Sequence, residues 1–230
     1  MNTDASALQL VLAVDPTLVA IVLLSLMVSL SAVLIAAVIG IPLGALIALT
    51  RFPGRGMAIV ALNALMGLPP VVVGLAVFLL LSRSGPLGSL GMLFTPQAMI
   101  VAQAILVTPI VAALARQTIE DLWEEYRDEF AAMNVGPVQR IGTLIWDGRF
   151  SLVTALLAGF GRSAAEVGAI IIVGGNIDGF TRTMTTAIAL ETSKGNLPLA
   201  VGLGIVLIAI IIAINALAWW ARRTGERYAG

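Results

Sequence analysis

The sequence is 230 residues long, 59% hydrophobic and only 11% charged, with a formal net charge of zero. A soluble globular domain carries about 25% charged residues, so this composition indicates an integral membrane protein and gives no reason to expect nucleic-acid binding. The chain has no Cys and no His. Their absence excludes disulfides and removes the commonest general base and metal ligands, so we expect no catalytic residue and no metal site.

The N-terminal segment, 1–16, is predicted to lie outside the membrane. It carries Asp4 and Asp15 but no basic residue, so it does not have the n-region of a signal peptide. Its apolar stretch, 5–14, is too short to span a bilayer. Two interpretations stay open: a helix on the membrane surface, or an extension of the first span.

Five apolar runs are long enough to cross a membrane: 18–49, 57–82, 98–115, 150–173 and 197–221. In lipid the backbone must satisfy its own hydrogen bonds, and runs of this length do so as helices. The last run ends in Trp219-Trp220, which suit a membrane–water interface. The sequence therefore predicts an all-α membrane protein with one five-helix domain, 17–222.

Basic residues predict the orientation of these spans, because Lys and Arg are retained in the cytoplasm. Nine of them fall in the segments after the first and third spans and at the C-terminal end, where Arg222 is followed by Arg223 and Arg227 of the tail, 223–230. Three fall on the opposite side. We therefore expect the N-terminus outside and the C-terminus in the cytoplasm.

Pro69-Pro70 interrupts the second run. Proline has no N–H and clashes with the preceding turn, so we expect a kink or an unwound segment there. Broken helices at membrane depth line cavities in transporters, which makes these two prolines candidates for a translocation path or gate. The alternative is that Pro and Gly, here and at Pro109, serve helix packing.

The segment 116–149 holds seven of the thirteen acidic residues and is predicted to be cytoplasmic. A helix over 117–135 should end near Asn134 and Gly136-Pro137, and a second helix should follow Pro137. The segment is either a solvated loop or a docking element. Small and apolar residues such as Ala131, Ala132 and Val135 favour docking into a groove on a partner.

Four stretches resemble a known family. EFAAMNVGPVQRIGTLIW (129–146) resembles the Glu-Ala-Ala…Gly coupling motif of permease subunits in binding-protein-dependent ABC importers. Two departures are visible: the family's Glu falls at Phe130, and Gly148-Arg149 replaces its Leu-Pro. LPPVVVG (68–74) and GRSAAEVGA with GGNIDGFTRTMTTAI (161–188) resemble oxyanion permeases, and TRTMTTAIALETSKGN (181–196) resembles those for tungstate.

The resemblance implies a type I importer fold in the inner membrane of a prokaryote. The chain would pair with a second copy and with two ATPase subunits, which hold ATP and Mg, so no cofactor is expected on this chain. An external tungstate-binding protein would deliver the anion. The implied contacts with the ATPase are Glu129, Ala131, Ala132, Asn134, Val135 and Gly136.

The sequence independently indicates that an ATPase must come from elsewhere. A P-loop needs Gly-Lys-Ser/Thr, and the only lysine, Lys194, follows Ser193 and precedes Gly195. The chain therefore carries no nucleotide site of that kind.

The loop after the fourth span is rich in Thr, Gly and Asn. Its hydroxyls are either donors to a tetrahedral oxyanion or helix caps. The resemblance makes this loop the meeting point with the binding protein, through Asn176, Asp178, Arg182, Thr185 and Thr186.

Arg162 and Glu166 lie in the middle of the fourth apolar run, four residues apart and so on one helix face. An isolated charge there costs about 2.5–3.5 kcal/mol, so this face must avoid lipid. Three roles compete: Arg162 attracts the oxyanion, the pair shifts between transport states, or the pair is a static ion pair. We favour the second, and place Ser163 with the pair in the path or gate.

Other functions remain as alternatives. Molybdate or sulfate is the alternative cargo. A stand-alone secondary anion carrier is a different class, but no inverted repeat is visible and only one carboxylate lies deep in a span. A membrane scaffold is a third reading.

Overall fold

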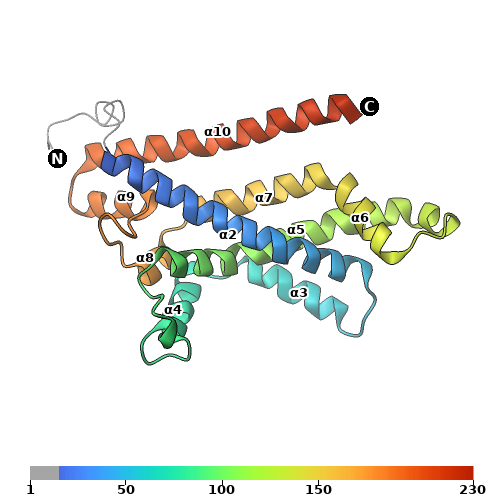
Figure 1. The fold of residues 1–230 in the computed structure, drawn as a ribbon, viewed down its shortest axis with the longest axis horizontal. Helices are drawn as coiled ribbons and strands as arrows, with labels where there is room; N and C mark the ends of the chain where they lie inside the picture. The colour runs from blue at the N-terminus through green and yellow to red at the C-terminus, as the bar shows by residue number, and fades with distance from the viewer. Residues whose placement is uncertain (1–15, 230) are drawn as a thin grey trace. The chain divides into compact units, whose positions relative to one another are not determined.

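The computed structural model describes residues 16–229, and this part of the chain is helical without any strand (Figure 1). The helices are α2 Pro16–Leu49, α3 Arg55–Met66, α4 Pro70–Leu81, α5 Pro96–Ala132, α6 Pro137–Asp147, α7 Arg149–Ala164, α8 Gly168–Gly174, α9 Met184–Ser193 and α10 Leu197–Ala229, with a short 3-10 helix η1 at Gly88–Leu90. The predicted all-α class is confirmed for this part. The predicted N-terminal segment, up to residue 15, lies outside the described residues.

Three of the described helices are long and apolar enough to cross a membrane: Pro16–Leu49, Pro96–Ala132 and Leu197–Trp220. Two pairs of shorter helices, α3 with α4 and α6 with α7, raise the number to as many as five if each pair is one span. The chain is therefore a multi-pass membrane protein with three to five candidate spans. Five spans and the orientation of the termini stay predictions.

Two helices extend beyond the predicted spans. The apolar run 98–115 is the first part of α5, which continues without a break through the acidic residues to Ala132. Likewise α10 continues to Ala229 and so includes residues 223–229 of the predicted tail. Good helix formers such as Glu, Gln and Arg allow both helices to continue past the apolar run.

The predicted break at Pro69-Pro70 is confirmed. Helix α3 ends at Met66 with Gly67 as its C-cap, and α4 begins at Pro70 in the first turn, where a proline costs no hydrogen bond. Pro42 and Pro109, in contrast, lie inside continuous helices.

The predicted turn in the acidic segment is also confirmed. Helix α5 ends at Ala132, Asn134 adopts a left-handed conformation with φ of 50°, and Gly136-Pro137 start α6. Asparagine tolerates positive φ better than most residues, and Pro is favoured at the first helical position.

The fourth span is not the continuous helix that the sequence predicts. Helix α7 ends at Ala164 and α8 begins at Gly168, so Arg162 lies in the last turn of α7 and Glu166 lies inside the break at 165–167. No proline marks this break. Its physical cause is that Glu166 caps α8, as described below.

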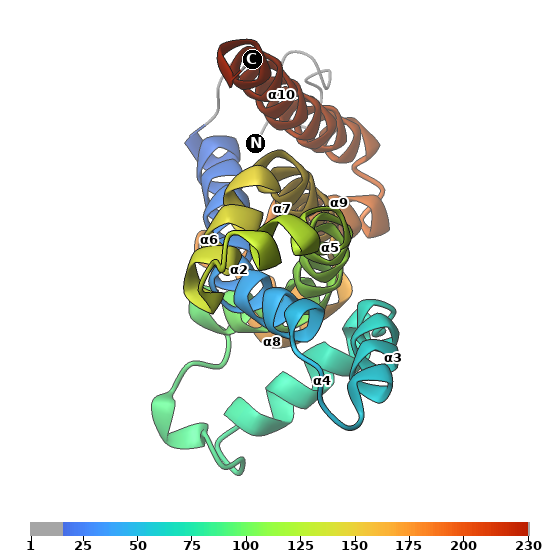
Figure 2. The same ribbon diagram turned by 90° about the vertical axis from the view of Figure 1, so that its right-hand side faces the viewer.

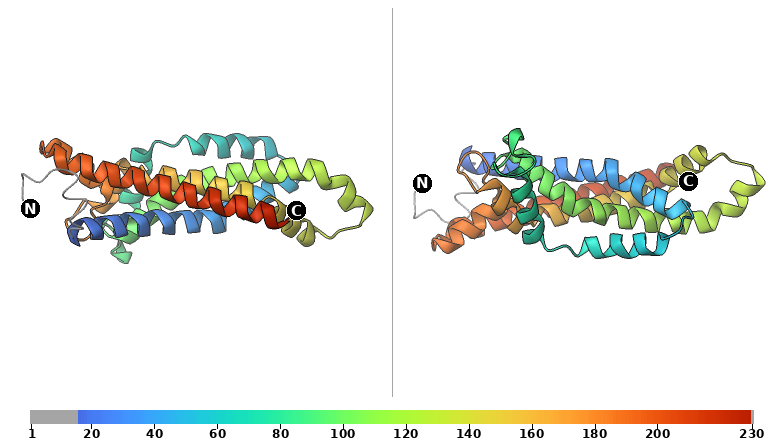
Figure 3. Two further views of the ribbon diagram at one scale, coloured as in Figure 1. Left: turned by 90° about the horizontal axis from the view of Figure 1, so that it is seen from above. Right: turned by 90° about the horizontal axis from the view of Figure 1, so that it is seen from below.

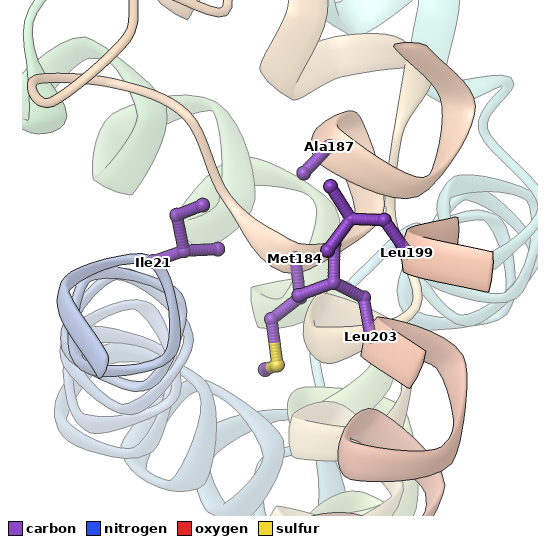
Figure 4. Packing of buried hydrophobic residues seen from close by; sticks show 5 residues of the cluster. All are labelled: Ile21, Met184, Ala187, Leu199 and Leu203. Atoms are coloured by element: carbon purple, nitrogen blue, oxygen red, sulfur yellow. The ribbon is translucent and has the colours of Figure 1, made fainter. Parts of the chain in front are cut away.

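The described residues form two compact units. The first comprises 16–32, 69–103 and 161–229, and the second comprises 33–68 and 104–160. In the first unit α4 packs on α8 and α9 packs on α10, and Figure 2 shows α4 leading into the segment that carries η1. A buried cluster joins the start of α2 to α9 and α10 (Figure 4); its members are Ile21, Met184, Ala187, Leu199 and Leu203.

In the second unit α3 runs beside the C-terminal half of α2 and the middle of α5 (Figure 3). Ile47, Leu62, Ala112 and Ala113 form the buried contact between these three helices. Gly44 allows the close approach of α2 and α5, because a Cβ at this position would lie 2.5 Å from the main-chain oxygen of Ala112.

Candidate functional site

The Arg162–Glu166 pair lies at the break between α7 and α8. Nη2 of Arg162 is 3.7 Å from Oε2 of Glu166, and the two side chains are 40% and 6% exposed. The partners are therefore not equivalent. Glu166 is buried, whereas the Arg162 guanidinium is partly exposed and its contact with the carboxylate is long.

Glu166 is held by more than its arginine. Its Oε1 accepts a hydrogen bond from the Ala169 N–H at 3.2 Å, and its main-chain oxygen accepts one from Thr185 Oγ1 at 2.8 Å. The first bond satisfies an unpaired donor at the start of α8. The second ties the break to α9. One residue thus connects three elements of the first unit, which explains why the helix is interrupted here.

Helix α4 crosses α8 directly beside Glu166. A Cβ at Gly74 would lie 2.8 Å from Cα of Ala169, and one at Gly168 would lie 2.9 Å from a methyl of Val71. The two backbones touch, so α4 and α8 have no room to approach further. The structure therefore brings the helix that begins at Pro70 against the helix that Glu166 caps, which joins two predicted parts of the path.

Two buried polar side chains at this break lack a partner. Oγ of Ser163 has none and this residue is 1% exposed; the amide of Gln103 has none at either atom and is fully buried. Ser163 belongs to the predicted site, but sequence reasoning did not select Gln103. A lone glutamine in a long apolar run was the available signal, because buried polar groups in spans are costly.

The position of Gln103 follows from the helix register. Met99, Gln103 and Val107 are four residues apart on α5 and so lie along one stripe. A Cβ at Gly174 would lie 2.8 Å from Sδ of Met99, and one at Gly159 would lie 2.7 Å from a methyl of Val107. On α5, Gln103 lies between Met99 and Val107, which make these two contacts. In the segment that contacts α5, residues 165–167 lie between Gly159 and Gly174.

The threonines of the predicted binding-protein loop are mostly internal. Thr183 and Thr186 form a capping box at the start of α9, and Thr185 bonds Glu166. Thr181 donates to the Gly174 oxygen at 2.6 Å and accepts from the Ile177 N–H at 2.9 Å. Of the two roles that the sequence left open for these hydroxyls, the structure gives them the role of caps and internal ties.

The other residues predicted for this loop are closer to the surface. Asn176 is half-buried with a φ of 51°, and Asp178 is exposed and pairs with Nη1 of Arg182 at 2.9 Å. Near them, Lys194 and Asn196 donate hydrogen bonds to the two carboxylate oxygens of Glu191. The Lys194 bond, helped by Asn196 and the charge of Arg182, lowers the pKa of Glu191 below its usual value despite burial.

The turn between α5 and α6 is an ordered, exposed corner. Glu129, Ala131, Ala132, Asn134 and Gly136 are exposed, and Val135 is half-buried. Phe130 is buried and stacks on Trp123, and its main-chain oxygen accepts a hydrogen bond from the Val135 N–H. Phe130, where the family has Glu, is therefore an anchor of the corner rather than part of its surface.

Arg140 of α6 also stabilises this corner. Nε of Arg140 donates to the Val135 oxygen at 2.7 Å, and its guanidinium lies 5.7 Å from the centre of the Trp123 ring. Met133 and Val138 are left 75% and 85% exposed. Two exposed apolar side chains on an ordered corner favour a docking element over a solvated loop.

A cluster of three charged residues, Arg55, Arg116 and Glu120, lies in the same unit. Arg55 and Arg116 each bond one oxygen of Glu120, and Arg55 also donates to the Ile47 oxygen at 2.9 Å. The triad links the turn after α2 to α5. Sequence reasoning missed it because Arg55 and Glu120 are 65 residues apart. Among residues 16–229, no group of three acidic, His or Cys side chains is placed to hold a metal ion.

Comparison with known proteins gives the class. The chain is 40% identical over 214 residues to the tungstate uptake system permease protein of Peptoclostridium acidaminophilum, covering 93% of this chain and 94% of that protein. It is also 40% identical over 205 residues to a probable anion ABC transporter permease protein of Haloferax volcanii, covering 87% and 88%. No family model matches the chain.

The chain therefore belongs to the family of anion ABC transporter permeases. Within that family, the tungstate uptake permease of Campylobacter jejuni is 41% identical over 69% of this chain. Permeases for molybdenum and sulfate transport are more distant relatives; that of Escherichia coli for molybdenum is 29% identical.

Proposed function

We propose that this chain is the membrane-spanning subunit of an ATP-driven tungstate importer in the cell membrane of a prokaryote. The observation that carries the proposal is the 40% identity to a tungstate uptake permease over nearly the full length of both chains. The apolar helices form the membrane-spanning part of the subunit, and Glu166, at the break between α7 and α8, is a buried charged residue within it.

In this proposal two copies of the chain enclose the path and two ATPase subunits drive it. Each ATPase subunit receives the corner of Glu129–Gly136, with Met133 and Val138 as its apolar contacts. Support comes from their exposure and from the anchoring of the corner by Phe130 and Arg140. The chain itself hydrolyses no ATP.

The Arg162–Glu166 pair acts as a hinge in the same scheme. Glu166 stays with α8 and α9, while Arg162 exchanges partners as the path opens. The long contact of 3.7 Å and the unequal burial of the two side chains support this role over a static ion pair. A deep arginine without a carboxylate would hold a dianion too tightly for transport, which needs release.

A binding protein outside the cell delivers the anion to the loop around Asn176 and Asp178. Asp178 is 67% exposed and is placed for such a contact. Thr185 and Thr186 act behind it by fixing α9, since both are buried.

Co-purification and ATPase stimulation test the proposal. The tagged chain, expressed with the ATPase and binding protein of its own system, should bring down the ATPase, which a stand-alone carrier or a scaffold would not do. In proteoliposomes, tungstate-loaded binding protein should stimulate hydrolysis more than molybdate or sulfate. Stimulation by molybdate or by sulfate alone would assign the chain to that anion instead.

A further inference from the structure

A cavity of about 290 Å³ lies in the first unit, between the first turns of α2 and α10 and the helix α9. Its lining has two parts. One side is polar, with Asp178, Arg182, Glu191, Lys194 and Asn196; the other is apolar, with Leu18, Ile21, Leu199 and Leu203 among its members. Figure 4 shows how three of these apolar residues also pack in the buried cluster: Ile21 of α2 faces Leu199 and Leu203 of α10 across Met184. None of these groups belongs to the predicted path or gate, although Asp178 and Arg182 also belong to the loop that is proposed to meet the binding protein.

The polar side keeps free donors after its own ion pairs are made. Arg182 gives Nη1 to Asp178, but its buried Nε has no partner. Lys194 gives one bond to Glu191 and is 53% exposed, so its ammonium has donors to spare. A guanidinium and an ammonium with unused N–H groups at one cavity suit a phosphate group.

The apolar side shows that the ligand also carries a hydrocarbon part. The apolar lining comes mainly from two candidate membrane spans, α2 and α10, which are the least covered of the three long helices. A small free anion gains nothing from contact with the leucine and isoleucine side chains on the apolar side. An acyl chain is stabilised by contact with such side chains.

We propose that this cavity binds a membrane phospholipid, with the phosphate on Arg182 and Lys194 and an acyl chain along Ile21 and Leu203. Asp178 and Glu191 balance the two cations, which suits a zwitterionic headgroup: the second oxygen of Asp178 is exposed and accepts from a primary ammonium. The site is separate from the anion path and stands even if the cargo is molybdate or sulfate.

Native mass spectrometry of the delipidated full-length chain in detergent tests this. Dioleoyl phosphatidylethanolamine is the probe, dioleoylglycerol has the same tails without phosphate, and sodium tungstate has the oxyanion without tails. We expect the phospholipid to bind as one tight copy per chain and the other two to bind weakly. Arg182→Gln and Lys194→Gln should each weaken phospholipid binding roughly tenfold, the loss of one charge-assisted hydrogen bond.

Arg83→Gln is the matched control, because it removes one exposed arginine of the segment after α4, outside this cavity, and should bind the lipid as the wild type does. Lys194 is half exposed, so its variant carries the test if Arg182→Gln does not fold. Equal binding of dioleoylglycerol, or unchanged affinity in Lys194→Gln, would overturn the proposal. Tight tungstate binding that both variants abolish would show that the cavity takes the free oxyanion and would overturn it too.

Discussion

Thr185 donates its hydroxyl hydrogen to the main-chain oxygen of Glu166 at 2.8 Å, although the two residues are 19 positions apart. The bond fixes α9 to the break in the fourth span, and the carboxylate of the same glutamate caps α8. One residue thus connects α9, α8 and the Arg162–Glu166 pair. Four predictions follow from this arrangement and from the corner between α5 and α6.

Thr185→Val keeps the shape of the side chain but leaves the buried Glu166 oxygen without this partner. We expect the free energy of unfolding to fall by about 1–2 kcal/mol, and transport to fall further because α9 and the break are uncoupled. Thermal unfolding in detergent and proteoliposome uptake measure the two effects. Thr154→Val is the control, since its exposed hydroxyl bonds only the Phe150 oxygen of its own helix; if both variants transport alike, the tie has no functional role.

Arg162→Ala removes the mobile partner of the pair. Glu166 keeps its bond from Ala169, so the fold should survive. We expect ATPase turnover coupled to transport to fall at least tenfold, with little change in docking of the binding protein. Normal transport by a correctly assembled Arg162→Ala complex would show that the pair does not act as a hinge. Arg83→Ala should behave as the wild type.

Gly74→Ala tests the crossing of α4 and α8. The new methyl would lie 2.8 Å from Cα of Ala169, where backbone has to move. We expect a loss of about 1–3 kcal/mol of stability and of most transport. Gly204→Ala is the matched substitution: the site is inside α10 with open space around it, so it should be neutral or slightly stabilising. Equal stability of the two variants would mean that the close contact does not exist in the membrane.

Met133→Asp tests the docking corner. A charge at this 75% exposed apolar side chain should abolish co-purification of the ATPase without affecting the fold. Gln117→Asp adds the same charge at an exposed site elsewhere on α5 and should leave co-purification intact. Retention of the ATPase by Met133→Asp would place the docking surface elsewhere.

The sequence predicts those features that local chemistry decides. A Pro-Pro pair such as Pro69-Pro70 interrupts a helix, and Asn134 with Gly136-Pro137 ends one helix and starts the next within four residues, so both breaks are visible without a structure. The exposed corner between α5 and α6 follows from the same turn. The pairing of Arg162 with Glu166 follows from their spacing alone.

Features that depend on distant parts of the chain were not predictable in this way. The break at 165–167 contains no proline, and it exists because Glu166 bonds α8 while Thr185 holds its carbonyl from another helix. The Arg55–Glu120 pair joins residues 65 positions apart. Gln103 stands out in the sequence as a lone glutamine in an apolar run, but its burial without a partner is a property of the packed helices.

Uptake of labelled tungstate into proteoliposomes that contain this chain, its ATPase and its binding protein tests the central claim most directly. ATP should drive accumulation of tungstate inside the vesicles, excess molybdate should compete less well than unlabelled tungstate, and Arg162→Ala should abolish accumulation while the binding protein still docks. Accumulation without ATP, or accumulation of molybdate or sulfate but not of tungstate, would contradict the account.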